Sequence, residues 1–122
     1  MIREGIQFHW ENNNYKSFDN FLSTLSSRKR KQIKKERECL KNNNLKVKLL
    51  SGDDLQKEDL EFFYECYLDT TGRKWGSTYL KKEFFMNILG NFKNKILLMI
   101  AYQNETKVAS ALNFLSKTHL YG

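Results

Sequence analysis

The sequence predicts an α/β (α+β) fold, a sheet flanked by helices, and three observations support this. First, 122 residues, 40% hydrophobic and without proline, are enough for one globular domain. Second, several short segments are continuously apolar or alternate apolar with polar residues, as strands do. Third, three longer segments repeat apolar residues at helical spacing. The longest apolar run, 96–101, is too short to cross a bilayer, and the first residues lack the apolar core of a signal peptide, so we expect a cytoplasmic protein.

We expect residues 1–44 to form a strand followed by a helical arm. Apolar and polar residues alternate over 6–10, which predicts a short strand. A polar turn follows, and Ser17 can then cap a helix over 18–25, where apolar residues recur at positions i, i+3, i+4 and i+7.

A second helix is predicted over 28–42, and it carries most of the net charge. Only Ile33 and Leu40 form an apolar stripe on it, so it cannot be a core helix. Residues 28–41 hold eight Lys or Arg and two Glu, a balance of +6 within a total of +7. The asparagines at 42–44 can adopt the left-handed turn that often ends a helix.

Residues 45–122 predict the order strand, helix, helix, strand, strand, strand. The expected elements are a half-buried strand over 45–49, a helix opened by Asp53 and Asp54 and closed by Gly72, a helix that follows Ser77 or Thr78 and ends near Gly90, a central strand over 96–101, and strands over 108–115 and 119–121. We expect the uninterrupted central strand to be covered on both faces. Because the last strand has barely begun at Gly122, we expect more chain to follow.

The basic helix is the first candidate binding element. Seven of its cations are candidate phosphate ligands: Arg28, Lys29, Arg30, Lys31, Lys34, Lys35 and Arg37. Helical spacing arranges them in two stripes, one with Arg30, Lys34, Arg37 and Lys41 and the other with Arg28, Lys31 and Lys35. Several positive charges on one face attract phosphates, and Arg adds a bidentate fork. The alternatives are a solvated helix face and an anionic membrane surface.

Other candidates are pocket residues without a catalytic pattern. Two cations and an indole in a linker, Arg73, Lys74 and Trp75, can hold an anion against an aromatic surface, unless the indole only fills the core. The remaining residue-based candidates are His9, Trp10, Asn113 and Tyr121, for which ordinary strand positions are the alternative. No Ser/His/Asp or Cys/His arrangement can be built, so we name no catalytic residue. No metal site is expected, since the acidic residues near 53–61 suit the start of a helix.

Several motifs together resemble one bacterial family. The residues are Gln7-Phe8-His9-Trp10, the run from Ser26 to Arg37, Tyr67, Asp69-Thr70, Arg73-Lys74-Trp75-Gly76, Tyr79-Leu80, Phe84-Phe85, Ala111-Leu112-Asn113 and Leu120-Tyr121-Gly122. They resemble the predicted N-acyltransferases of peptidoglycan biosynthesis or recognition, which are related to Fem-type aminoacyl transferases. The predicted element order is also similar to the first half of the Gcn5-related N-acetyltransferase (GNAT) fold.

The resemblance implies a function and its ligands. It implies that 45–122 is the first half of a GNAT-like domain with a mixed sheet, truncated here, and it adds Tyr79 to the pocket candidates. The donor would be acyl-CoA or an aminoacyl-tRNA, and the partner a phosphate-bearing cell-wall precursor or tRNA. We expect this interior fragment to be inactive alone, because it has no glycine-rich loop before a helix for the donor's pyrophosphate. The alternative is a non-catalytic basic module that binds nucleic acid or another polyanion.

Overall fold

The structure is a computed structural model that describes residue 6, residues 8–74 and residues 77–122. The chain divides into two compact units, Met1–Cys39 and Leu40–Gly122, and each is described by itself. Trp75, a predicted pocket residue, and Gly76, part of the motif quoted for the family resemblance, lie outside the described residues.

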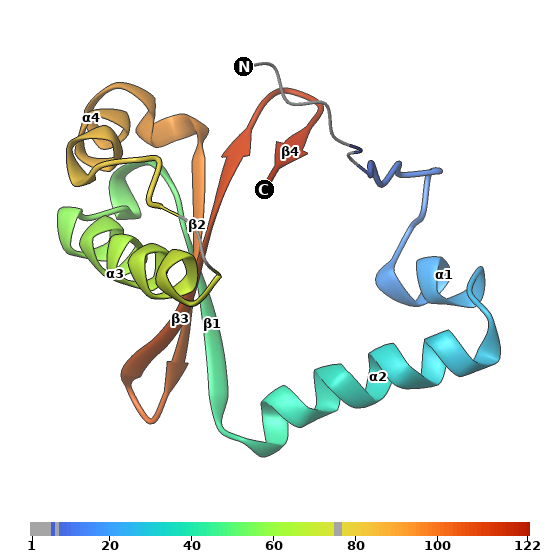
Figure 1. Cartoon of the computed structure of the whole chain (residues 1–122). Coiled ribbons are helices and arrows are strands. Elements are labelled where there is room, and N and C mark those ends of the chain that lie inside the picture. Colours follow the sequence, from blue (N-terminus) through green and yellow to red (C-terminus); the bar gives the residue numbers. More distant parts are fainter. Residues whose placement is uncertain (1–5, 7, 75–76) are drawn as a thin grey trace. The chain divides into compact units, whose positions relative to one another are not determined.

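The first unit contains helix α1 (Phe18–Ser23) and most of helix α2 (Ser27–Asn42) (Figure 1). The predicted cap of α1 is confirmed, because the Asn20 amide donates a 3.1 Å hydrogen bond to Ser17 Oγ. The predicted strand over 6–10 is wrong, since residues 6 and 8–10 have no strand structure. Alternation alone does not make a strand, which also needs a neighbour to pair its backbone.

Helix α2 matches its prediction closely. It runs from Ser27 to Asn42, none of its residues is buried, and Asn44 has the expected left-handed backbone, with φ at 53°. A helix without a buried side chain draws little stability from the core, so local contacts must hold it.

The second unit is an antiparallel sheet with both long helices on one side (Figure 1). Its strands are β1 (Leu45–Leu50), β2 (Ile96–Gln103), β3 (Thr106–Leu115) and β4 (Leu120–Tyr121), in the spatial order β1-β2-β3-β4. Between β1 and β2 lie η1 (Gly52–Asp54), α3 (Lys57–Arg73), α4 (Lys82–Phe92) and η2 (Lys93–Lys95). The predicted α/β class and element order are therefore confirmed, and every described strand pair is antiparallel.

The core lies between this sheet and the helices. Three alternate residues of β2, Ile96, Leu98 and Ile100, are fully buried against Leu60 of α3 and Phe85 of α4. Truncating one such leucine or isoleucine to alanine costs about 2–5 kcal/mol. Strand β2 is interior, as predicted, but its other face is only half-buried rather than covered.

Strand β1 turns two of its apolar residues, Val47 and Leu49, away from the helices. Leu50 pairs with Leu98 and packs against the core, and successive side chains of a strand point to opposite faces. Val47 and Leu49 therefore lie on the far face, where they are 53% and 60% exposed. Residues 45–49 form a strand, as predicted, but the prediction that it is half-buried is wrong, since residues 46–49 are all exposed. Alternation groups the residues of one face and does not show which face the helices cover.

Both helices of this unit begin later than predicted. Helix α3 starts at Lys57 because the Asp59 carboxylate accepts a hydrogen bond from the Gln56 amide at 3.2 Å. Before α4, the amides of Tyr79 and Leu80 both donate to the Tyr67 hydroxyl oxygen, at 3.1 and 3.3 Å. The Tyr67 hydroxyl thus holds the segment that precedes α4, which begins at Lys82.

Candidate functional site

Three cations of one α2 stripe, Arg30, Lys34 and Arg37, contact α1 or the turn that follows it. The Arg30 guanidinium donates to the carbonyls of Leu22, Ser23 and Leu25 at 3.2–3.5 Å, where α1 ends. Lys34 pairs with Asp19 at 3.7 Å, and the Arg37 guanidinium lies 4.2 Å from the centre of the Phe18 ring. These three candidate phosphate ligands thus connect α2 to α1 and to the turn between the two helices.

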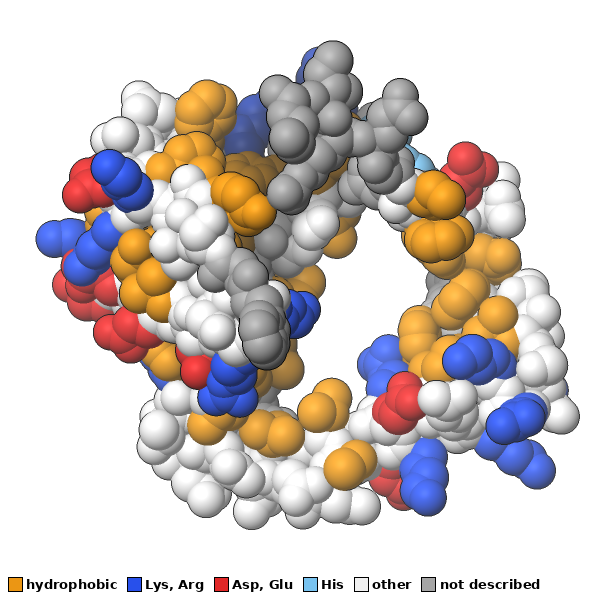
Figure 2. Space-filling model, in the orientation of Figure 1, with side chains coloured by type: hydrophobic (Ala, Val, Ile, Leu, Met, Phe, Trp, Pro, Cys, Tyr) orange, Lys and Arg blue, Asp and Glu red, His pale blue; other side chains and the backbone are white. Residues whose placement is uncertain are grey.

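The other stripe of α2 is available to a ligand. Arg28, Lys31 and Lys35 are exposed, and within the described part of the chain none of their side chains has a hydrogen bond or ion pair. They follow one another at i, i+3 and i+7, so they line one side of the helix over roughly 10 Å. The Lys29 ammonium donates a 3.4 Å hydrogen bond to the Gln32 side-chain oxygen. Lys and Arg side chains project from α2 in Figure 2.

An aromatic hollow lies beside α1 in the same unit. Its lining residues are Trp10, Asn12, Tyr15, Ser17, Phe18 and Phe21, around a volume of about 390 Å³. Hydrophobic side chains gather over this part of the chain in Figure 2. Trp10, a predicted pocket residue, is 64% exposed, while its neighbour His9 is exposed and not part of the lining.

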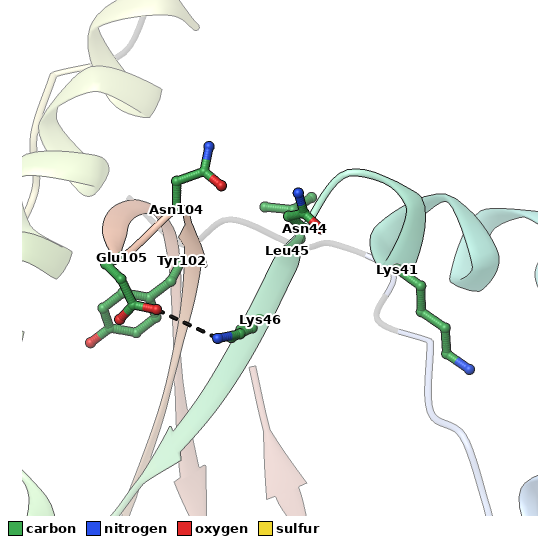
Figure 3. Close-up of a pocket in the computed structure, with 7 residues that line it drawn as sticks. All are labelled: Lys41, Asn44, Leu45, Lys46, Tyr102, Asn104 and Glu105. Carbon is green, nitrogen blue, oxygen red and sulfur yellow. Dashed lines mark hydrogen bonds and ion pairs between the residues drawn. The ribbon is translucent and has the colours of Figure 1, made fainter.

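A second hollow, of about 360 Å³, lies where β1 begins and the β2–β3 turn ends (Figure 3). It is lined by Lys41, Asn44, Leu45, Lys46, Tyr102, Asn104 and Glu105. The Lys46 ammonium pairs with the Glu105 carboxylate at 3.5 Å, which leaves the wall near neutral. Lys41 points away from the other lining residues in Figure 3. This hollow is thus a weaker anion site than the exposed stripe of α2.

The predicted linker pocket is only partly described. Arg73 donates to the Asp69 carboxylate at 2.9 Å, an exposed pair within α3, and Lys74 forms the end of that helix. Tyr79 is 72% exposed and is tied to Tyr67 through its own backbone amide. The described residues do not bring these three side chains around one cavity.

Asn113 and Tyr121 lie on neighbouring strands, as predicted. The Asn113 side-chain amide donates to the Leu97 carbonyl at 3.4 Å across the β2–β3 pair. Tyr121 pairs with Phe114 at the sheet edge and stacks on His119, with ring centres 5.7 Å apart. Each is thus engaged in a sheet contact.

The family of the chain follows from a comparison with known protein families. The model of the FemAB-like family, described as peptidoglycan biosynthesis/recognition, matches residues 1–122. The chain belongs to the FemAB-like family. A search of curated proteins found no match.

The described part of this FemAB-like chain holds no assembled acid–base or metal site. No group of three or more His, Cys, Asp or Glu in it is placed to hold a metal ion. The pKa of Glu61 is lowered, chiefly by its hydrogen bond from Lys82, whose own pKa is raised by the same contact. Burial, aided by nearby carboxylates, raises the pKa of the Cys66 thiol, which makes it a poor nucleophile. No described helix of the FemAB-like chain is long and apolar enough to cross a membrane.

The structure adds residues that the sequence analysis missed. Asn12, Tyr15 and Phe21 complete the hollow around Trp10. A signal for this cluster was present, because Tyr15, Phe18 and Phe21 recur every three residues. In the FemAB-like chain the candidates therefore fall into two groups in the first unit, the exposed cations and the aromatic hollow, and scattered positions in the second.

Proposed function

We propose that this FemAB-like chain is part of an N-acyltransferase that modifies an amine of a peptidoglycan precursor. The observation that carries the proposal is the family match over the whole chain. A two-helix connection between the first two strands of an antiparallel sheet supports it, because the GNAT fold that we expected begins with this order. The chain would then hold the substrate side of such a domain.

The reaction is transfer of an acyl or aminoacyl group from acyl-CoA or an aminoacyl-tRNA. The amine nitrogen attacks the acyl carbon, the bond from that carbon to the donor's sulfur or oxygen breaks, and the nitrogen gives up a proton. Positioning and polarisation of the carbonyl supply much of such catalysis, so a strong side-chain base is not required.

The phosphates of the substrates are assigned to the exposed stripe of α2. Arg28, Lys31 and Lys35 are cations without partners among the described residues, whereas Arg30, Lys34 and Arg37 are engaged with α1. Nucleotide-linked precursors, acyl-CoA and tRNA all carry phosphates that such a row can bind.

A transfer assay tests this proposal. The whole enzyme that contains this chain is incubated with a UDP-linked muramoyl peptide and with either acetyl-CoA or charged tRNA, and the mass of the peptide is measured by mass spectrometry. We expect a donor-dependent gain of one acyl or aminoacyl group. Absence of any gain with every donor would overturn the assignment as a transferase.

Charge reversals test the role of the stripe. The variant R28E/K31E/K35E is expected to raise the KM at least tenfold and leave the fold intact, because these side chains are exposed. A control with the same charge change, K81E/K95E/K117E, alters exposed lysines of the second unit and is expected to keep the parent KM. Equal losses in both variants would refute a specific phosphate site.

The second candidate function is a non-catalytic module that binds a polyanion. The same unpaired cations favour it, since a stripe of this kind attracts any phosphate backbone. Affinity that falls steeply with salt, is the same for single-stranded RNA of any sequence, and is accompanied by no transfer would support this function instead.

A further inference from the structure

The aromatic hollow of the first unit has the form of a small-molecule site. Four rings surround it, and their centres lie 5.4–6.1 Å apart for the pairs that involve Trp10, Tyr15, Phe18 and Phe21. Its volume of about 390 Å³ falls within the range of known ligand pockets, about 300–1,000 Å³. Mostly apolar walls with a few polar groups are also typical of such sites.

Local hydrogen bonds hold the walls in place. The Tyr15 amide donates to the Asn12 side-chain oxygen at 3.0 Å, and the Lys16 amide donates to the Asn20 side-chain oxygen at 3.2 Å. The Asn12 oxygen is thereby used, whereas its NH₂ group donates to no described residue. The hollow therefore combines ring surfaces with an amide donor at its rim.

The chemistry of the lining residues limits the charge of a ligand that can enter the hollow. None of the lining residues is charged, so the part of a ligand that enters is uncharged. The Arg37 guanidinium lies 4.2 Å from the centre of the Phe18 ring, and this positive charge disfavours an ammonium group in the hollow.

The angles between the rings exclude a slot for a flat base. The Trp10 and Phe21 rings are inclined by 84°, those of Tyr15 and Phe21 by 66°, those of Phe18 and Phe21 by 46°, and those of Trp10 and Tyr15 by 33°, so no pair is parallel. A nucleobase sandwich needs two parallel faces, which these pairs do not offer. A sugar ring suits inclined rings better, because its C–H bonds point in several directions and its hydroxyl and acetamido groups reach polar atoms at the rim.

We infer that this hollow binds a single N-acetylated amino sugar of a peptidoglycan strand or precursor, with the ring against the exposed indole of Trp10 and a polar substituent accepting from the Asn12 NH₂ group. The inference rests on the peptidoglycan substrate of the proposed function, and it gives the first unit a role in holding the glycan. It requires no donor and no transfer step.

The test is titration of the polypeptide with a GlcNAc–MurNAc disaccharide, followed by the NMR shift of the Trp10 indole N–H and by calorimetry. We expect the indole signal to move, and W10A to weaken binding at least tenfold while W10F retains part of it. The control F8A removes an aromatic ring that is 92% exposed and does not line the hollow, and it is expected to leave affinity unchanged. N12A is expected to weaken binding several-fold.

Three outcomes would overturn the inference: no shift with the disaccharide, equal loss in F8A and W10A, or tighter binding of uridine monophosphate than of the disaccharide at the indole. The result is separable from that of the transfer assay. Sugar binding without transfer would support the sugar site and refute the proposed transferase activity. Transfer without an effect of the Trp10 variants would support the transferase activity and refute the sugar site.

Discussion

The contact between Asp59 and Lys107 is expected to hold helix α3 to the sheet. Asp59 is only 8% exposed, and its carboxylate accepts from the Lys107 ammonium at 2.8 Å and from the Gln56 amide at 3.2 Å. The first contact joins α3 to β3 across 48 residues, and the second caps the helix. Removing the carboxylate therefore loses a long-range contact and a cap together.

The size of the effect follows from these two bonds. A lost cap costs about 1 kcal/mol and a lost hydrogen bond to a charged group about 1.5–3 kcal/mol, so D59A should lower the free energy of unfolding by about 2.5–4 kcal/mol. Because the Lys107 side chain is 28% exposed and keeps part of its hydration, the lower end is expected. D59N, which keeps an oxygen for the Gln56 amide, should lose about 1 kcal/mol less.

Urea unfolding followed by far-UV circular dichroism measures these values. The cycle of D59N, K107M and the double variant should give a coupling energy of at least about 1 kcal/mol, because the two groups touch. The reasoning fails if D59A unfolds at the same urea concentration as the parent, or if the two single effects simply add.

Three further predictions concern the second unit. Glu105 has φ at 67° in the turn after Asn104, so E105G should stabilise the chain by up to about 1 kcal/mol, because the ion pair that it loses is exposed and contributes little. A melting temperature below that of the parent would contradict this. The pKa of Glu61 is lowered and that of Lys82 raised by their contact. The stabilisation by this pair should therefore be lost as pH falls below about 4.3, the ordinary value for Glu, and as pH rises above about 10.4, the ordinary value for Lys. E61Q should remove the share of both losses in melting temperature that this pair causes. Finally, iodoacetamide at pH 8 should alkylate exposed Cys39 before Cys66, whose pKa is raised by burial; mass spectrometry that finds equal rates would contradict this.

Features fixed by neighbouring residues were predictable from the sequence. The Ser17 cap, the bounds of α2 and its Asn44 ending depend on side chains within a few positions, and all were found. The start of α3 was missed because Asp59 caps the helix from inside, where a carboxylate looks like an ordinary first-turn acid. The burial of strand β1 was misjudged because Leu50, and not Val47, packs against the core. Which face of the strand meets the helices depends on their packing and cannot be read from the alternation.

In the candidate site, too, local features could be predicted from the sequence and contacts between elements could not. Helical spacing correctly separates the cations of α2 into two stripes, since the geometry of a helix is regular. It gives no sign that Arg30 reaches three carbonyls of α1, which belong to another helix. The aromatic hollow likewise joins a residue before the helix, Trp10, with residues on it, and no single period links them.

The lack of buried residues in α2 gives ionic strength two opposite effects on this chain. Arg28 and Lys31, and Lys31 and Lys35, are like-charged neighbours on the helix, and each such pair destabilises it by about 0.2–0.5 kcal/mol at low salt. Added salt screens this repulsion and favours the helix, but it also weakens the hold on phosphate. A bound phosphate chain neutralises the same charges, so the ligand itself strengthens the helix that binds it. Helix content should therefore rise with the fraction of chain that has bound polyanion, whereas added salt should raise helix content and lower affinity for the polyanion.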